Sequence, residues 1–569
     1  MRRILACSAC LALIFAVGAR AAPPSAYQTV VSDYFDGEWR ASPTAATSAG
    51  LHDWDARLDD VSAPAHAREA ARLTAILARL KAVDAASLSP IERDDRDILA
   101  ARIDGQLLQE QTIQPWRHNP ATYVDLMTAG VYSLIERDFA PLPDRMRSVV
   151  ARERAIPAML AAAKQNLGDM PPVFVDIALE NLDGATGFLG KDVPSAFGDV
   201  TDPALKAELD ASTQTALTAV ADYKAFLLAK KPAAHGDFVL GREVLQRLLA
   251  SDMVDVPVDQ VMAAGRAQLA KDHAAFLETE KLVDPATPSG ALALIEKDHP
   301  DGEHLIGVAR DQLVSLRAFI ESHKIVDLPS PMLPTVAETP PFSRALIFGE
   351  LDPPGPLETH ATKAYYFITP PDPAAPKAEQ ENLLEYFNTA LLQNLSVHEA
   401  LPGHFVQYLF QRANPGWSLV RATAGSYTAT EGWAHYSEQM MLDEGLGGGD
   451  PKLRLAQLQD ALLRDCRLVA SVGMHTRAMS LAQATTMMEQ ECFQPASVAP
   501  KEARRGTSDP GYFSYTLGKL EILKLRADVR AKEGAAFTLA HFHDRFLNAG
   551  LIPIAMIRRE ILGVDGPAL

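Results

Sequence analysis

Three residues in one short segment have the types needed for metal-dependent hydrolysis. Residues 391–411 read LLQNLSVHEALPGHFVQYLFQ and contain His398, Glu399 and His404. Zinc hydrolases bind the metal through neutral imidazoles, and they place a nearby carboxylate, itself not a ligand, where it can take a proton from water. The usual motif has histidines at i and i+4 on one helical face. Here Pro402 stands at i+4 from His398, so the usual spacing fails.

The spacing of the two histidines sets a condition on the helix that carries them. On a regular helix, His404 would lie about 120° around and about 9 Å along from His398. Two nitrogens at about 2.1 Å from one zinc ion lie within about 4 Å of each other. The helix must therefore deform if both bind, and Pro402 with Gly403 favours a kink. The alternative is a helix that ends at Leu401, with His404 starting another element for packing reasons.

A second segment offers a third ligand. Glu431, His435 and Glu438 follow at i, i+4 and i+7, which places them on one helical face. A carboxylate from the next helix commonly completes a zinc site with two histidines and leaves a position for water. We expect Glu431 to be this ligand, with His435 and Glu438 orienting a ligand through hydrogen bonds. The alternative is a solvated polar face.

The two motifs together carry a family resemblance. HEALPGHFVQ and TEGWAHYSE resemble the bacterial family known as domain of unknown function 885, whose members carry His-Glu-x-x-Pro-Gly-His and Glu-Gly-Trp-Ala motifs. The likeness extends over most of the chain, to FSYTLGKLEI and to residues 542–544. The family is mostly helical and looks like zinc peptidases of the Glu-zincin type. The resemblance implies a peptide-like substrate, Glu399 as general base, and three ligands for one zinc ion: His398, His404 and Glu431. It implies no metal role for His435.

Residues after the motifs could stabilise the reaction or bind the substrate. Amide hydrolysis needs a hydrogen-bond donor for the developing oxyanion besides the metal. Residues 511–515 contain two phenols, and we favour Tyr515 over Tyr512 as this donor; aromatic packing is the alternative. Arginine binds a carboxylate through a two-pronged contact. The candidates for a substrate carboxylate are Arg467, His475, Arg477 and Arg504, with surface or helix-pairing charge as the alternative for each.

Helices must position these residues. Between about residues 65 and 324, apolar residues recur at three- and four-residue spacing between charged ones, which is typical of helices. The pattern predicts helices over 66–82, 91–109, 145–167, 203–229, 258–282 and 303–324. Helical patterning resumes after residue 377, with breaks near 445–450 and between 495 and 512. We therefore expect a mainly α fold.

Prolines separate these two helical stretches. Many lie between residues 327 and 376, and no long helix can run through them. The best candidate strand there is 364–368, either an edge strand that binds a peptide main chain or a buried structural strand. We expect a large, zinc-peptidase-like multi-helix body with this small β element before the motif helix. We divide it into an N-terminal helical region, 22–345, and a C-terminal region with the metal site, 346–569; the two could also form one domain.

The first residues read as an export signal. Two arginines precede an apolar run of 15 residues, and Ala19-Arg20-Ala21 has the small-x-small form of a cleavage site. We predict a signal peptide at 1–21 and a periplasmic or extracellular protein with no membrane association after cleavage. A membrane anchor is the alternative, although the run is shorter than the ~20 residues needed to span a bilayer. Cys466 and Cys492 remain after cleavage and could form a disulfide or stay as two buried thiols.

Composition narrows the function classes. The 569 residues are 47% hydrophobic and 22% charged, which excludes a disordered chain. Acidic residues outnumber basic ones by 72 to 54, a net charge of -18 that argues against nucleic-acid binding. Without Arg2, Arg3 and Arg20, 51 basic residues remain and the charge becomes -21. The sequence contains no Gly-x-Ser-x-Gly elbow, phosphate-binding loop or dinucleotide fingerprint.

These observations favour an exported zinc-dependent peptidase that hydrolyses short peptides, with Glu399 as general base. One alternative is a non-catalytic exported binding protein whose metal site is structural or vestigial. Another is a zinc esterase or amidase that acts on non-peptide substrates. The sequence leaves residue preference, exo- or endo-cleavage and oligomeric state open.

Overall fold

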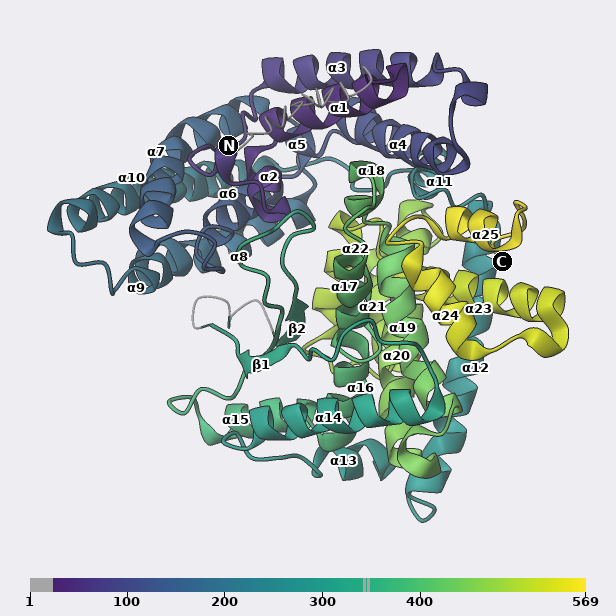
Figure 1. Ribbon diagram of the computed structural model, residues 1–569. Coiled ribbons are helices and arrows are strands. Elements are labelled where there is room, and N and C mark those ends of the chain that lie inside the picture. Colours follow the sequence, from purple (N-terminus) through teal and green to yellow (C-terminus); the bar gives the residue numbers. More distant parts are fainter. Residues whose placement is uncertain (1–23, 341–343, 345–347) are drawn as a thin grey trace, which may run out of the picture.

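Helices make up most of the described part of the chain (Figure 1). The computed structural model describes residues 24–340, 344 and 348–569, so the predicted signal peptide lies outside the described residues. The mainly α prediction is confirmed, and the one small sheet comes before the motif helix as expected. None of the helices in the described ranges combines the length and apolar character that crossing a bilayer requires.

The first half of the chain contains the six predicted helices and several others. Its helices are α1 (Ala26–Ala41), α2 (Pro43–Ala49), α3 (Ala63–Lys81), α4 (Pro90–Leu108), α5 (Pro115–His118), α6 (Ala121–Tyr132), α7 (Leu142–Asn166), α8 (Pro172–Gly187), α9 (Val193–Ala196), α10 (Pro203–Lys230), α11 (Arg242–Ser251), α12 (Val258–Val283), α13 (Ala291–Glu296) and α14 (Leu305–His323). The predicted ends differ from these by at most three residues. Local start signals explain the agreement: Ser89 caps α4 in a capping box with Glu92, and the Asp202 side chain caps α10.

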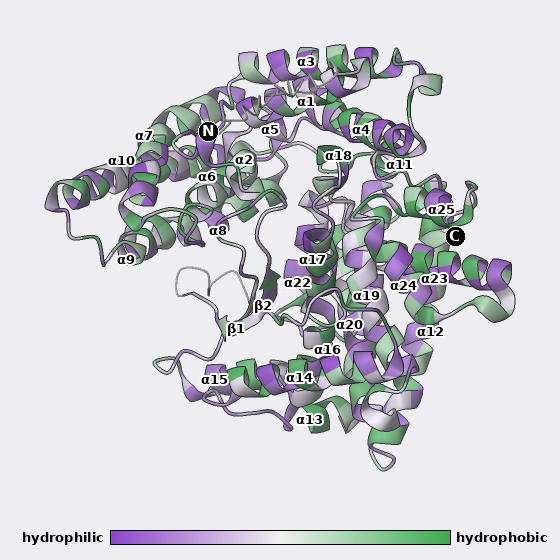
Figure 2. Cartoon of the chain, viewed as in Figure 1, coloured by the Kyte–Doolittle hydropathy of each residue, from purple (hydrophilic) through white to green (hydrophobic). Residues whose placement is uncertain are grey.

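Two helices that the periodicity did not predict are apolar on most sides. α6 and α8 contribute Val124, Met127, Val175 and Leu182 to one buried cluster with α7 and α10. Charged residues are few on both helices, so a regular spacing of apolar and charged residues is hard to recognise in the sequence. Figure 2 shows how hydrophilic and hydrophobic residues alternate along the ribbon of the more exposed α3.

The sheet has three short strands, β1 (Thr335–Glu338), β2 (Gly349–Asp352) and β3 (Tyr365–Ile368), in the order β1-β3-β2. β1 runs parallel to β3, and β2 runs antiparallel to it. The prediction of a strand at 364–368 is confirmed. Its interpretation as an edge strand is wrong, because both edges of β3 are paired; β2 is an edge strand instead.

The second half of the chain supplies the helices in the centre of Figure 1 and those at its right edge, as well as α15 at the lower left. They are α15 (Lys377–Tyr386), α16 (Thr389–Glu399), α17 (His404–Ala413), α18 (Leu419–Ala422), α19 (Tyr427–Asp443), α20 (Pro451–His475), α21 (Leu481–Gln490), α22 (Ala499–Ser508), α23 (Ser514–Glu533), α24 (Leu539–Asn548) and α25 (Ile554–Leu562). The expected break near 445–450 is present, with Gly445, Gly447 and Gly448 at positive φ. The break predicted between 495 and 512 is wrong in part, because α22 lies inside it; its Pro500 stands in the first turn, where a missing N–H costs nothing.

Helices from both halves pack side by side. Between the halves, α12 lies along α20 and α14 contacts α16, whereas α7 lies along α10 within the first half and α19 along α23 within the second. One buried cluster includes Tyr34 of α1 and Leu99 of α4 together with Trp433 of α19 and Phe546 of α24. The division into regions 22–345 and 346–569 stays a prediction, but elements on both sides of residue 345 support the helices that carry the motifs.

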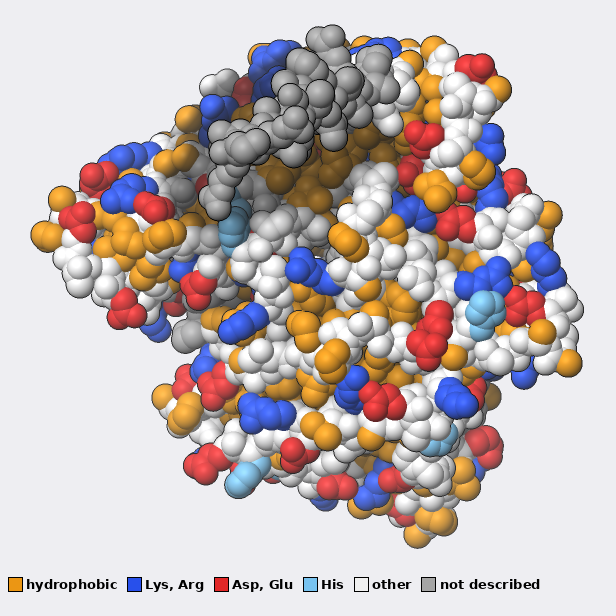
Figure 3. Space-filling model, in the orientation of Figure 1, with side chains coloured by type: hydrophobic (Ala, Val, Ile, Leu, Met, Phe, Trp, Pro, Cys, Tyr) orange, Lys and Arg blue, Asp and Glu red, His pale blue; other side chains and the backbone are white. Residues whose placement is uncertain are grey.

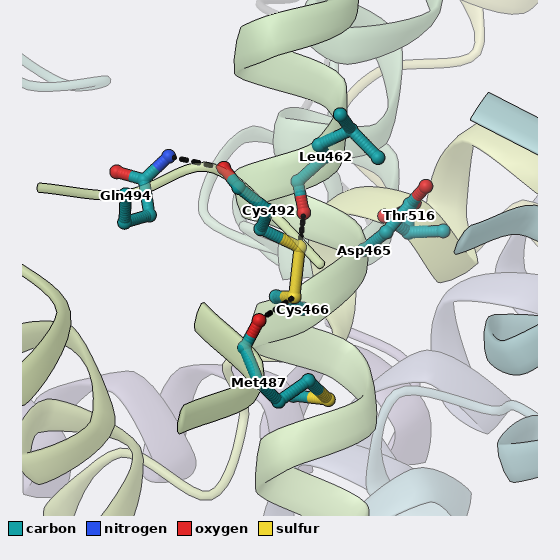
Figure 4. The surroundings of a disulfide bond; sticks show 7 residues. All are labelled: Leu462, Asp465, Cys466, Met487, Cys492, Gln494 and Thr516. Carbon is teal, nitrogen blue, oxygen red and sulfur yellow. Dashed lines mark hydrogen bonds between the residues drawn. A yellow bond between two sulfur atoms is a disulfide. The ribbon is translucent and has the colours of Figure 1, made fainter. Parts of the chain in front are cut away.

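The two cysteines left after the predicted cleavage form a disulfide. Cys466 lies in α20 and Cys492 follows α21, and their Cα atoms are 6.4 Å apart (Figure 4). The alternative of two separate thiols is therefore wrong. The bond ties α21 to α20, the long helix that also packs against the motif helix α16.

The molecular surface mixes both signs of charge. On the face shown in Figure 3, acidic and basic side chains are interspersed among hydrophobic and neutral ones. The net charge of -18 is therefore not gathered into one patch on this face.

Candidate metal centre

The chain breaks between the two motif histidines. α16 ends at Glu399 and α17 begins at His404, so the helix does not bend as expected but breaks completely. The alternative prediction, a helix that ends at Leu401, placed this end two residues too late. Gly403 lies so close to the preceding helix that a Cβ atom there would stand 1.7 Å from the carbonyl oxygen of His398. Trp433 holds the connection from the other side, since its indole N–H donates to the carbonyl of Pro402 at 2.8 Å. Only glycine fits this turn.

The break brings the two histidines together as metal binding requires. Their ring centroids are 4.9 Å apart and the ring planes are nearly perpendicular. The Nε2 atom of His398 lies 3.7 Å from Glu431 Oε2, and that of His404 lies 3.6 Å from the same oxygen. The ligand atoms offered by the three residues all lie within 4.8 Å of one another. The 3.6 and 3.7 Å separations suit ligands at about 2 Å from a common ion, and the 4.8 Å limit is slightly above the roughly 4 Å that such bonds allow.

A close helix crossing places Glu431. The next residue, Gly432, faces Gly518 of α23, and a Cβ atom on Gly432 would lie 2.6 Å from the backbone of Gly518. A Cβ atom on Gly518 would lie 2.1 Å from the carbonyl oxygen of Thr428. These two glycines let α19 and α23 approach at backbone distance. In the motif, Glu431 is therefore the candidate ligand, and the adjacent Gly432 makes the close helix contact that positions it.

Each histidine has its other ring nitrogen held by the protein. Nδ1 of His398 lies 2.6 Å from Glu438 Oε1, and Nδ1 of His404 lies 3.0 Å from Gln407 Oε1. The Gln407 amide is oriented by donation from its Nε2 to the carbonyls of Ala429 and Thr430, which leaves Oε1 as an acceptor. Each Nδ1 therefore has a fixed acceptor for its proton, and both Nε2 atoms face Glu431. We did not predict Gln407, although its i+3 spacing from His404 is visible in the sequence.

The protonation of the three residues is strongly coupled. Burial alone would lower the pKa of His398, but its contacts with Glu431 and Glu438 raise it to about 10. Burial would also lower the pKa of His404, but its contact with Glu431 raises this pKa above the ordinary value. Burial would raise the pKa of Glu431, but the two histidines lower it far below its ordinary value. Protons and a metal ion therefore compete for the same nitrogens.

A second layer of buried charge lies behind His398. Glu438 contacts His398, and its other oxygen lies 3.2 Å from Nδ1 of His435. Arg464 of α20 approaches the same carboxylate at 3.3 Å. Burial raises the pKa of Glu438, but the charge of Arg464 and its histidine partners lower it well below the ordinary value, so the group is ionised. Glu438 thus contacts the candidate ligand His398 directly, whereas His435 contacts Glu438 and not the ligand. Arg464 was not predicted, because no spacing relates it to the motifs.

Glu399 stands next to the candidate ligands but is held by the sheet. Its Oε2 accepts the backbone N–H of Leu351 at 2.8 Å, from the edge of β2 that does not pair with β3. Its charge contributes to the raised pKa of His398 and of His404. The neighbouring Glu350 has its pKa raised to about 7 by burial and by the charges of Glu399 and Asp352. One carboxylate oxygen of Glu399 is thus committed to the backbone, and the other carries no such bond.

The two candidate tyrosines differ in their partners. Tyr512 is fully buried and donates its phenol O–H to Glu502. The ring of Tyr515 lies 6.3 Å from that of Tyr427, which precedes Glu431 by one helical turn. Burial and the charge of Glu431 raise the pKa of Tyr515, which keeps the phenol protonated as a hydrogen-bond donor. Of the two tyrosines, Tyr515 therefore fits better as the one that lies near the candidate ligands.

Comparison with known families agrees with the two motifs. The model of a family described as bacterial protein of unknown function (DUF885) matches residues 43–561. The chain belongs to the DUF885 family. This match covers nearly all of the described residues, so the same family model includes the helices of the first half and the candidate metal centre of the second.

Two solved structures have the same fold as this DUF885 chain. One, from Shewanella oneidensis, is described as a "putative lipoprotein of unknown function"; it is 27% identical, with a TM-score of 0.80 over 95% of this chain and 100% of that one. The other, from Colwellia psychrerythraea, is described as a "putative lipoprotein"; it is 19% identical, with a TM-score of 0.81 over 95% of this chain and 99% of that one. No protein with a curated description matches the chain.

The four candidates for a substrate carboxylate in this DUF885 chain all have partners within the protein. Arg467 forms a two-pronged pair with Glu502 at 2.9 and 3.1 Å. Arg504 forms a similar pair with Glu180 at 2.8 and 2.9 Å, and the exposed Arg477 pairs with Asp237. His475 is buried, with Nε2 3.0 Å from the carbonyl of Gly506. The alternative of helix-pairing charge describes the three arginines better than an open substrate site.

Proposed function

We propose that this protein is an exported zinc-dependent hydrolase that cleaves short peptides. One observation carries the proposal: the Nε2 atoms of His398 and His404 converge on one oxygen of Glu431, while both Nδ1 atoms are held by acceptors. Such an arrangement fits a metal ion better than a set of hydrogen bonds, because 3.6–3.7 Å is too long for direct hydrogen bonding.

The donor set suits zinc. Two imidazole nitrogens and one carboxylate oxygen are the three protein ligands of many catalytic zinc sites. Hard, oxygen-preferring ions such as magnesium and calcium take carboxylates, carbonyls and water rather than two imidazoles. The acceptors on Nδ1, Glu438 and Gln407, are of the kind that orients metal-binding histidines.

The residues around the ligands have the properties that hydrolysis needs. Zinc, when bound, supplies a Lewis acid that polarises a carbonyl oxygen and makes water more acidic. Glu399 would take a proton from water and return it to the leaving amine, acting through the oxygen that Leu351 does not hold. Tyr515 would donate its phenol hydrogen bond to the developing oxyanion. The Leu351 N–H keeps Glu399 beside the ligands without making it one.

Export rests on the start of the chain and on its relatives. The predicted signal peptide at 1–21 has the form that secretion requires. Both similar solved structures carry the description "putative lipoprotein", which is consistent with an exported location. The disulfide between Cys466 and Cys492 also fits an oxidising compartment.

The test combines metal analysis with peptide digestion. The purified protein, its Glu399→Gln variant and a control Glu379→Gln variant, altered at an exposed glutamate of α15, are analysed for zinc and incubated with a mixed-peptide library. We expect about one zinc per chain in all three, cleavage by the wild type and the control, and at least about a hundredfold less by Glu399→Gln.

Three outcomes would contradict parts of the proposal. Equal cleavage by the wild type and Glu399→Gln would exclude the general-base role. A wild type without zinc affinity would exclude the metal centre. Zinc binding without any peptide cleavage would favour the non-catalytic binding protein or, if esters or other amides are cleaved, a hydrolase of non-peptide substrates.

A further inference from the structure

Two adjoining cavities lie along the segment that joins α22 to α23, just before Tyr515. The larger, of about 760 Å³, is lined by residues of the first half such as Gln109 and Phe238 and by His475, Arg505 and Asp509 of the second. The smaller, of about 540 Å³, is lined by Tyr427 and Ser514 and shares Gln109, Asp509 and Pro510 with the larger. The shared residues make the two cavities neighbours along the segment that joins α22 to α23.

Of the described residues that line the smaller cavity, Tyr427 is the nearest in the chain to a candidate ligand, and no candidate ligand lines the cavity itself. Tyr427 begins α19, one turn before Glu431, and its ring contacts that of Tyr515. Tyr515 in turn lies under Arg464, whose Cζ is 5.8 Å from its ring centroid and which contacts Glu438. A chain molecule bound at the metal centre could therefore pass Tyr427 and continue toward Arg505 in the larger cavity.

Arg505 differs from the other arginines of this region in its unused donors. Its nearest acidic partner among the described residues is Asp509, at 3.7 Å and one helical turn away. That separation is too long for a direct hydrogen bond. Its Cζ lies 4.8 Å from the Tyr512 ring centroid, on a ring that Arg467 also contacts at 4.7 Å. Arg467 forms two hydrogen bonds with Glu502, whereas Arg505 is about half exposed, with 47% of its side chain accessible.

We propose that Arg505 binds the C-terminal carboxylate of the substrate, so that the enzyme prefers short peptides with a free C-terminus; this rests on the proposed function above. A guanidinium forms two parallel hydrogen bonds with a carboxylate, and the long contact to Asp509 leaves these donors available. Cavities of this size accommodate small ligands, which for a peptide means a few residues.

The experiment compares two forms of one peptide. The peptide that the wild type cleaves fastest in the library is synthesised with a C-terminal carboxylate and with a carboxamide, and kcat/KM is measured for both. The variants are Arg505→Gln and, as a matched control, Arg504→Gln, whose side chain pairs with Glu180 instead. We expect the wild type and Arg504→Gln to prefer the carboxylate form by about tenfold to a hundredfold, and Arg505→Gln to lose this preference.

The possible failures can be told apart. If the wild type cleaves both forms equally, the role of Arg505 is excluded while the proposed function stands. If Arg504→Gln loses the preference for the carboxylate peptide as much as Arg505→Gln does, the preference comes from the overall positive charge of α22. Specific binding by Arg505 is then excluded. If no peptide is cleaved at all, the proposed function fails, and calorimetric titration with trialanine, a short peptide with a free C-terminal carboxylate, decides the rest. Equal or absent binding to the wild type and Arg505→Gln overturns the inference as well.

Discussion

The protein contains two clusters of histidine and carboxylate that use their ring nitrogens differently. In the His52 cluster (His52, Asp55 and Glu358), Nδ1 lies 3.1 Å from Asp55 and Nε2 lies 2.9 Å from Glu358, a residue 306 positions later in the chain. The ring also stacks on Phe139 at 3.8 Å. Both nitrogens of His52 are therefore satisfied by direct contacts within the protein.

In the metal-site cluster (His398, His404 and Glu431), only one nitrogen of each histidine has a direct partner. The other nitrogens face a shared carboxylate oxygen at 3.6–3.7 Å. A histidine beside a carboxylate is thus not by itself a metal site. What distinguishes the metal-site cluster is that its unpaired nitrogens converge at separations that suit an ion rather than a hydrogen bond.

The two clusters are also linked. The His52 cluster holds the loop between β2 and β3 against the first helices, and Arg137 of that half pairs with Asp352 at the end of β2. β2 in turn holds Glu399 through the N–H of Leu351. The first half of the chain therefore helps to position the candidate general base, although it supplies none of the candidate ligands. The following predictions test how far the functions of the two clusters are separate.

The largest expected effect is on zinc binding. His404→Ala should lower zinc affinity by about a thousandfold, because removing one of a few ligands costs a large share of the binding free energy. The matched control, His52→Ala, should leave zinc affinity unchanged. Competition with a chelator of known affinity measures both. Equal losses in the two variants would mean that the clusters cannot be assigned separate roles.

The pH dependence of zinc binding should follow the raised pKa values of the metal-site histidines. Since the pKa of His398 is about 10 and that of His404 is also raised, binding at pH 6–8 must displace protons. Affinity should therefore rise with pH, by about tenfold per pH unit for each proton displaced and by up to about a hundredfold for two. Titrations at pH 6, 7 and 8 check this. An affinity that does not change with pH would contradict the coupling.

The acceptor behind His398 should have a smaller effect. Glu438→Gln keeps the size of the side chain but removes the charge that orients the ring, so zinc affinity should fall by about tenfold to a hundredfold. Glu358→Gln, the equivalent change in the His52 cluster, should not alter zinc affinity. If Glu438→Gln binds zinc as tightly as the wild type, the acceptor is dispensable.

The smallest effect should be on the stability that His52 contributes. Burial lowers its pKa, but hydrogen bonds with Asp55 and Glu358 raise it above the ordinary 6.5. A raised folded-state pKa gives stabilisation that is complete below about pH 6.5 and is lost as the pH rises through the folded-state value. The difference between the wild type and His52→Gln should thus be larger at pH 5.5 than at pH 9, and below about 1 kcal/mol because the ring is partly exposed.

Urea unfolding midpoints without added metal, at pH 5.5 and pH 9, measure this difference. His304→Gln serves as the control, because His304 also pairs with an aspartate but is largely exposed. A larger effect of His52→Gln at pH 9 than at pH 5.5 would reverse the predicted sign. Zinc affinity rises with pH while this stabilisation falls, so the two clusters should respond to pH in opposite directions.

Local patterns in the sequence were sufficient for the main helices and for the identity of the candidate ligands. A helix such as α12 has alternating exposed and buried faces, so its apolar spacing and its ends can be recognised. His398, Glu399 and Glu431 were identified because their residue types and short spacings are themselves the chemical signal. Even the break between α16 and α17 was partly foreseen, since Pro402 and Gly403 disfavour a continuous helix.

The tertiary structure decided everything that depends on distant parts of the chain. Arg464, the β2 edge that holds Glu399 and the His52 cluster are brought to their partners by packing, and no local spacing marks them. The same reason separates Arg505 from Arg504: adjacent arginines on one helix point to different surroundings, and only the folded chain shows that Arg504 meets Glu180 while Arg505 faces a cavity. Residue type sets which chemistry is available, and burial and contacts between distant segments determine which residues can perform it.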